Sequence, residues 1–257
     1  MKNQFLPGLI GAALLLPALL CAQVTTPASL RLLPPDKETY HELEVNINAK
    51  DLKAFKTSRG LKLGTIPKKM SFDKQPLTAE TMKLRGKTSL KFRRKSYRVE
   101  LDDDFNFETN YGSKPLKDFH LLSLAMDRGY FGNRLAFDCL EEAGVFKLYR
   151  AYTELKINGQ SEGLYGLIQR PEDYAIKDLG SPYVLRRSAV DFVIADYKSA
   201  KDQTPRKKIR YDKVYETLID ASKNLEGQAQ FDFFRTHLDL DAYCTWLALN
   251  HWFQNGD

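Results

Sequence analysis

The feature that most constrains the fold is a pair of strand-like segments joined by Asn158-Gly159. Tyr152 to Ile157 alternates polar and apolar residues, and the run from Gly163 to Ile168 resumes after the turn. An Asn-Gly pair tolerates the positive φ angles of a two-residue hairpin turn. The segment therefore predicts a β-hairpin, and the fold has to accommodate antiparallel strands.

Other segments predict more strands first and helices later. Glu42 to Asn48 alternates as a strand does, and so does the stretch from Lys83 to Leu101, with a break at Gly86. We expect an exposed loop at Asp102 to Asp104 and a helix over residues 133–143 that Gly144 ends. Later helical faces are Val214, Leu218, Ala221 and Leu225, and then Leu240, Tyr243 and Leu247 after an N-cap at Asp239. The pattern predicts an α+β fold with a sheet-rich N-terminal part and a helical C-terminal part.

Composition narrows the class of protein. The 257 residues are 43% hydrophobic and 28% charged, which excludes a disordered chain. The formal net charge of +6 gives a mild preference for anionic partners without naming one.

The beginning of the chain predicts export. Lys2 precedes an interrupted apolar run from Phe5 to Leu20, so residues 1–22 are interpreted as a signal peptide and 23–39 as a linker. Cys21 offers an alternative, a lipid anchor. No later apolar stretch is long enough to predict a transmembrane span. We therefore expect one folded domain over 40–257 in a protein that is secreted, periplasmic or at the cell surface.

Cysteine and histidine do not predict a metal centre. Cys139 and Cys244 are interpreted as two small buried hydrophobes, with a disulfide between them as the alternative. The four histidines are scattered, so a cage of His and Cys ligands is not expected.

The densest polar feature is basic. The sixteen positions from Lys83 to Arg98 hold eight Lys or Arg residues on strands around a Gly-containing turn. Such a run binds phosphates if its side chains converge, or forms a solvated sheet face if they do not. A nucleic-acid surface is not expected, because Phe92 and Tyr97 have the pattern of core residues rather than of an exposed stacking surface.

Three further polar residues, Asp127, Asn133 and Asp257, could have either a structural role or a role in a site. Asp127 is interpreted either as a cap or as a site residue, and so is Asn133 at the start of the predicted helix. Asp257, after a helix that ends in Asn255-Gly256, is taken by itself as a loop residue.

Taken together, four segments resemble the CotH kinase family, which is named for spore coat protein H. They are residues 85–89 with 94–99 (RGKTS and RKSYRV), 127–135 (DRGYFGNRL), 155–165 (LKINGQSEGLY) and 239–257. They match the family's R-G-N-S-S and K-K-S-Y motifs, its D-K-S-x-x-R-N-K-L segment, its Y-I-N-G hairpin and its N-x-D loop, in that order.

The resemblance implies an atypical protein-kinase-like fold that binds ATP and Mg²⁺ and phosphorylates Ser or Thr of a protein substrate. Phosphoryl transfer needs cations at the phosphates and an acidic group that orients the acceptor hydroxyl. Carried over by motif, Lys95 is the phosphate-contacting cation, Arg85 and Arg94 support it, and Asp257 is the catalytic Asp.

This sequence departs from the family pattern at Lys87, Gly132 and Gln169, where the family has Asn, Arg and Glu. The family's metal-binding Asp lies beyond its N-x-D loop, so the metal ligands are unknown and the sequence is expected to be a fragment. The alternative to a kinase is a catalytically inactive surface-binding, adhesion or coat-assembly module with the same fold.

Overall fold

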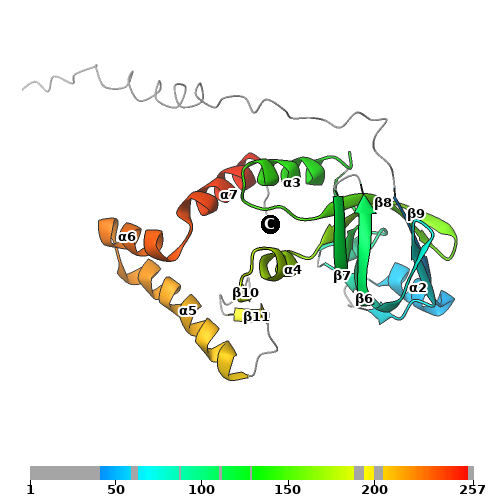
Figure 1. Ribbon diagram of the computed structural model, residues 1–257, viewed down its shortest axis with the longest axis horizontal. Helices are drawn as coiled ribbons and strands as arrows, with labels where there is room; N and C mark the ends of the chain where they lie inside the picture. The colour runs from blue at the N-terminus through cyan, green and yellow to red at the C-terminus, as the bar shows by residue number, and fades with distance from the viewer. Residues whose placement is uncertain are drawn as a thin grey trace, which may run out of the picture. The chain divides into compact units, whose positions relative to one another are not determined.

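The computed structural model describes residues 41–58, 63–86, 88–109, 112–127, 129–187, 194–199 and 205–253 (Figure 1). The predicted signal peptide, the linker, Lys87 and Asp257 lie outside the described residues. The strands are β1 (His41–Asn46), β2 (Gly64–Thr65), β3 (Lys69–Phe72), β4 (Gln75–Leu77), β5 (Ala79–Arg85), β6 (Ser96–Thr109), β7 (Gly112–Leu122), β8 (Arg150–Ile157), β9 (Gln160–Gln169), β10 (Tyr183–Arg187) and β11 (Ile194–Ser199). The helices are α2 (Ala49–Thr57), η2 (Thr88–Lys91), α3 (Gly132–Glu142), α4 (Pro171–Asp173), η3 (Tyr174–Asp178), α5 (Pro205–Asn224), α6 (Gly227–His237) and α7 (Leu240–Trp252).

Most of the strands form one mixed sheet. Among the described residues it has nine strands in the order β2-β5-β6-β7-β9-β8-β1-β3-β4, and β10 and β11 pair separately. All its pairs are antiparallel except β1 with β8. Strands thus dominate the N-terminal part and helices follow, which confirms the predicted α+β class.

The predicted hairpin is β8–β9. Asn158 and Gly159 have φ angles of 51° and 76°, as a two-residue turn of this kind requires. The Asn158 side chain also accepts a hydrogen bond from the main-chain N–H of Ile47, at 2.9 Å, which ties the turn to the end of β1. The hairpin is therefore fixed by the fold as well as by its own sequence.

One face of the sheet holds the hydrophobic core. In β6 the alternate residues Tyr97, Val99 and Leu101 are at most 2% exposed, and the matching residues of the neighbouring strands meet them. Helix α2 covers this face with Phe55, whose ring centroid lies 5.9 Å from that of Tyr97. Phe92, by contrast, is 36% exposed, so its predicted place in the core is wrong.

The predicted loop at Asp102 to Asp104 is also wrong, because β6 continues through it to Thr109. The three carboxylates are exposed, so solvent accommodates them while the backbone stays in the strand. The register of β6 against β7 shifts between Glu100 and Phe105, and this irregularity interrupts the pairing of the two strands at the three aspartates.

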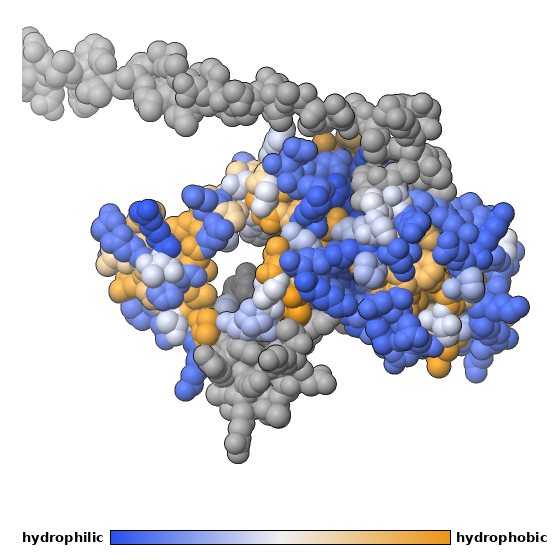
Figure 2. All heavy atoms as spheres, in the orientation of Figure 1, coloured by the Kyte–Doolittle hydropathy of each residue, from blue (hydrophilic) through white to orange (hydrophobic). Residues whose placement is uncertain are grey.

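The predicted helices form, but their apolar faces are largely exposed. Helix α3 occupies the expected range, and the Asp239 carboxylate caps α7 by accepting from Ala242 N at 3.0 Å. Among the described side chains of α5, α6 and α7, only Ala221 is buried, and Figure 2 shows hydrophobic residues at the surface of these helices. Within the described ranges, no helix is both long and apolar enough to span a membrane.

Both described cysteines are free thiols, as predicted, but neither is buried. Cys139 is half-buried and Cys244 is exposed.

Candidate functional site

Lys95 lies on the core side of the sheet, beside α2. Its side chain is buried, with the residue 3% exposed, and Nζ donates to the main-chain oxygens of Ser58 and Leu90 at 2.6 Å each. These two bonds join the end of α2 to η2. The ammonium group therefore has a structural role, and its predicted contact with a phosphate stays a prediction.

Arg94 is held between two tyrosine rings. Its guanidinium carbon lies 5.5 Å from the ring centroid of Tyr130 and 5.0 Å from that of Tyr165. Nη1 donates to the Tyr130 hydroxyl at 2.7 Å, and Nη2 donates to Leu164 O. At Gly163, where φ is +92°, an added Cβ would lie 3.5 Å from the guanidinium carbon. Arg94 thus connects the loop that contains Tyr130 to Leu164 of β9, and two of its nitrogen donors are used within the fold.

Arg85 lies on the other face of the sheet from Lys95. In β5 the preceding residue, Leu84, faces the core, so Arg85 projects from the opposite face, here called the outer face. The register places Lys83 opposite Arg98, and Arg98 opposite His120 of β7. The basic run therefore divides between the two faces, and only part of it converges on the outer face.

Three arginines gather on the outer face, and we call Arg85, Arg98 and Arg170 the arginine cluster. Arg170 binds Asp118 through Nη1 at 2.5 Å. Arg98 Nη2 lies 3.4 Å from the same Asp118 oxygen and also contacts Glu100. Two members of the cluster are thus partly neutralised by carboxylates.

His120 marks the centre of the arginine cluster. Burial lowers the pKa of its imidazole to about 3, and the positive charges of all three arginines add to this effect. Its Nδ1 is buried and has no hydrogen-bond partner among the described residues, and the same is true of the Nε atoms of Arg98 and Arg170. The outer face therefore presents a neutral imidazole beside three arginines, with the carboxylates of Glu100, Asp118 and Glu172 close to two of them.

Arg85 differs from the other two arginines. Its guanidinium makes no hydrogen bond or ion pair with any described residue, although Glu172 is near enough to act on it at longer range. Burial lowers the pKa of Arg85, with Glu172 opposing and Arg170 adding to that shift. A partly desolvated guanidinium without a counter-ion is unfavourable, and an anion bound to its fork of donors would offset that cost.

Sequence reasoning singled out Arg85 but missed three partners. Arg98 belongs to the basic run, but only the pairing of β5 with β6 places it opposite Lys83. Nothing in the local sequence distinguishes His120 or Arg170, because their proximity depends on the pairing of β7 with β6 and β9.

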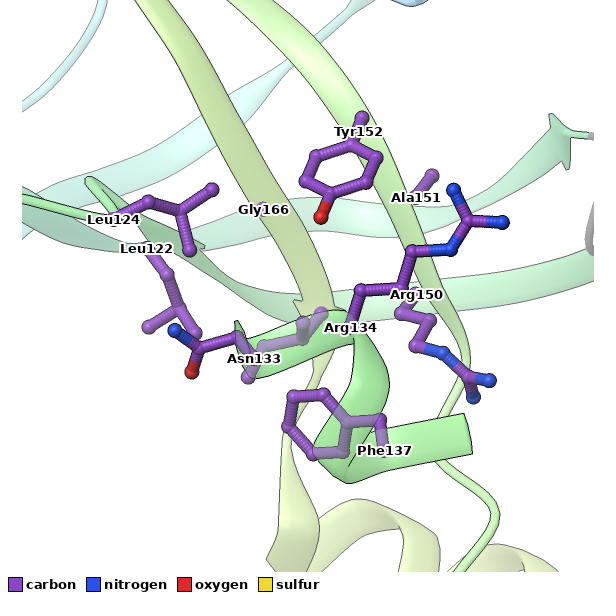
Figure 3. A pocket seen from close by; sticks show the side chains of 10 residues that line it. Leu122, Leu124, Asn133, Arg134, Phe137, Arg150, Ala151, Tyr152 and Gly166 are labelled. Atoms are coloured by element: carbon purple, nitrogen blue, oxygen red, sulfur yellow. The ribbon is translucent and has the colours of Figure 1, made fainter. Parts of the chain in front are cut away.

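A small apolar pocket continues the outer face under α3 (Figure 3). Leu122, Gly166 and Ile168 form its floor, and Phe137 of α3 closes it. Its volume of about 30 Å³ is close to that of one water molecule, so it is a packed contact between α3 and the sheet.

Asp127 caps α3. Its Oδ1 accepts from Phe131 N and Gly132 N at 3.3 and 3.1 Å, and its Oδ2 accepts from Asn133 N and Nδ2 at 2.8 and 3.1 Å. Partial burial opposes the ionised form, but these hydrogen bonds outweigh it and lower the pKa of Asp127. The structural interpretation of Asp127 is confirmed, whereas Asn133 donates to the cap instead of supplying it.

A larger cavity, of about 640 Å³, lies between α3 and α7. Its volume is within the range of small-molecule sites. Its walls include Met126, Asp127, Phe137, Trp246, Asn250 and Phe253. Phe253 precedes Asp257 by four residues in the sequence, and Asp257 itself lies outside the described residues.

Gln169, where the family has Glu, is used inside the fold. It is 1% exposed, its Nε2 donates to Asp178 at 2.7 Å, and its Oε1 accepts from Tyr149 N at 3.3 Å. An ionised Glu at this position could accept from Tyr149 N but could not donate to Asp178. The described residues also contain no group of three or more His, Cys, Asp or Glu that could hold a metal ion.

Comparison with known proteins agrees with the resemblance. The chain is similar to inner spore coat protein H of Bacillus subtilis (strain 168), with 23% identity over 184 residues. The match covers 64% of this chain and 47% of that protein, so the chain spans about half the length of this curated relative.

The family model described as CotH kinase protein matches residues 82–257. The match includes the arginine cluster, α3, the β8–β9 hairpin and α7. Because it covers more than half of the sequence, the chain belongs to the CotH kinase protein family.

Proposed function

We propose that this chain binds ATP and is part of an exported protein kinase that transfers the γ-phosphate to Ser or Thr of a protein. Two observations support the proposal: the chain belongs to the CotH kinase protein family, and the arginine cluster on the outer face could bind an anion. The observation that carries the proposal is Arg85, a partly desolvated guanidinium that has no ion pair with a described residue and lies beside two other arginines.

The residues divide between binding and support. The arginine cluster fits a polyphosphate, since its guanidinium groups hold positive charge at any physiological pH and present forked donors. Lys95 and Arg94, whose contacts lie within the fold, support the strands and the loop around it. Asp257 is proposed to orient the acceptor hydroxyl, as the family motif implies.

Magnesium is part of the proposal only through the family. ATP is used as its Mg²⁺ complex, and the ion neutralises charge on the transferred phosphoryl group. The residues described here provide no acidic cluster for it. The steps assigned to this chain are therefore phosphate binding by the arginine cluster and orientation of the acceptor by Asp257.

The location outside the cytoplasm is likewise proposed. The curated relative is named an inner spore coat protein, which suits a chain whose first residues have the pattern of a signal peptide. We propose that the acceptor is a protein of the same coat or surface compartment. A surface-binding, adhesion or coat-assembly module without catalysis is the alternative, and the name of the relative gives a place in the coat and no activity.

The test compares two variants that each remove one arginine from the basic run. Arg85→Gln deletes the unpaired guanidinium of the arginine cluster, and Arg93→Gln deletes an exposed one. Loss of one charge-assisted contact should weaken Mg-ATP binding about tenfold or more in Arg85→Gln, measured by calorimetry. Arg93→Gln should bind as the unchanged protein does. Equal affinity in the two variants would contradict the assignment of the site.

Transfer is tested separately with the full-length protein, γ-labelled ATP and a Ser/Thr-rich acceptor. Asp257→Ala should abolish incorporation of label while Mg-ATP binding persists. Equal incorporation of label by Asp257→Ala and by the unchanged protein would refute the role of Asp257. Binding of ATP without transfer by the unchanged protein would favour the non-catalytic module.

A further inference from the structure

A second charged surface lies on the β3–β4 hairpin, apart from the arginine cluster. A groove of about 430 Å³ runs over β1, β3 and β4. Lys68, Lys69 and Lys74 line it, and its lining also includes Met70 and Leu77, which are buried in the core. None of its lining residues belongs to the arginine cluster, so the groove is independent of the proposed phosphotransfer.

The charge of the groove is not neutralised within the fold. All three lysines are exposed, and their ammonium groups make no hydrogen bond or ion pair with any of the described residues. Glu44 is the one acidic residue in the lining. Three positive charges against one negative charge therefore face the same hollow.

The backbone that carries these lysines is held in place. Lys68 N donates to Asn46 O at 2.7 Å, which fixes the approach to β3. At the other end, Asp73 accepts from Glu42 N at 2.8 Å and lies 2.6 Å from His41 Nδ1. Because these bonds anchor the hairpin, the backbone positions of the lysines are set before any partner arrives, which limits the entropy lost on binding to that of the side chains.

The form of the groove indicates which partner fits. Pro76 lies on β4, the last strand of the described sheet, and has no N–H with which to add a further strand. The lining has no aromatic side chain on which bases would stack. Contacts must therefore come from lysine side chains, which act as point charges and suit carboxylates.

We propose that this groove docks an extended acidic segment of a partner protein. Lys69 begins β3 and Lys74 lies in the turn that follows this strand, so the two are roughly 10 to 13 Å apart, because the four residues of β3 rise about 3.3 Å each. An extended chain covers that distance in about four residues. The partner segment therefore carries carboxylates about four positions apart, one for each end of the groove.

The probe is a fluorescein-labelled eight-residue peptide with two Glu-Glu pairs whose first residues are four positions apart. Its affinity for the full-length chain is measured by anisotropy, and it should fall as the salt concentration rises. The triple variant Lys68→Glu, Lys69→Glu and Lys74→Glu should bind about tenfold more weakly or worse. The same three positions changed to Gln provide a second variant with a smaller change of charge.

The matched control reverses Lys50, Lys53 and Lys91, which are exposed on α2 and η2 and change the net charge equally. The control should bind the peptide within about twofold of the unchanged protein, since screening limits the effect of distant charges. Equal losses in the two triple variants would overturn the proposal. So would equal binding of a peptide with Gln in place of Glu, or no binding of the Glu peptide.

Discussion

Replacing Lys95 with Met separates a structural role from a phosphate-binding one. The buried ammonium donates to Ser58 O and Leu90 O, and Met keeps an unbranched apolar side chain, one atom shorter, while removing both bonds. Hydrogen bonds of a charged group are worth about 1.5 to 3 kcal/mol each. Two of them sum to about 3 to 6 kcal/mol, and the relief from burying an ammonium offsets part of this sum.

We therefore expect Lys95→Met to lower the free energy of unfolding by about 3 kcal/mol. For a domain of this size, that corresponds to a fall in Tm of about 6 to 12 °C. Thermal unfolding followed by circular dichroism measures the change. Lys91→Met, an exposed substitution in the same basic run, should shift Tm by less than about 2 °C.

The same melting experiment can also refute the structural role of Lys95. Mg-ATP raises the Tm of a protein that binds it, so each variant is melted with and without the nucleotide. If Lys95→Met melts like the unchanged protein but no longer gains stability from Mg-ATP, the structural reasoning is wrong. The phosphate role implied by the family resemblance would then be supported instead.

Three further predictions follow from buried or capping groups. Asp127→Ala removes the cap of α3 and should cost about 1 to 2 kcal/mol in urea unfolding, whereas Asp127→Asn should cost less, because Asn is also a good cap. Gln169→Glu places a carboxylate against Asp178 in a buried site and should lower the free energy of unfolding by about 2 to 4 kcal/mol at neutral pH. Part of this stability should return in acid, because the pair of carboxylates then takes up a proton. An unchanged urea midpoint would contradict this prediction. His120 has a pKa lowered to about 3 in the folded state, so below pH 6.5 the unfolded state binds a proton that the folded state does not. Stability should therefore fall by up to about 4 kcal/mol as pH drops from 6.5 toward 3, and His120→Gln should reduce that slope in parallel unfolding curves.

Much of the fold follows from local patterns in the sequence. The β8–β9 hairpin depends on Asn158 and Gly159, whose backbone angles almost specify the turn by themselves. The loop predicted at Asp102 to Asp104 failed because exposed charge does not exclude a strand: the backbone stays extended across a register shift, with β6 paired to β7 on both sides of it. Polarity indicates what surrounds a side chain, and it does not decide whether the backbone is extended.

The candidate site was less predictable, because it depends on register. Arg85 and Lys95 belong to one basic run, yet the strands direct them to opposite faces of the sheet. Gly86 and η2 separate the two residues, so parity could not show their relative faces, and the sequence could not show which face is covered by α2. His120 and Arg170 join the arginine cluster only through contacts between strands that are distant in the sequence.

The contact between Arg94 and Gly163 links two positions in the fold. An Ala Cβ at position 163 would make an ordinary contact with the guanidinium at 3.5 Å but would be strained at a φ of +92°, and a longer side chain would compete with the guanidinium for the same space. A relative that loses this glycine is therefore expected to have a shorter side chain at position 94, and with it no tie to the loop at Tyr130. Covariation of the two positions across homologous sequences would record that constraint.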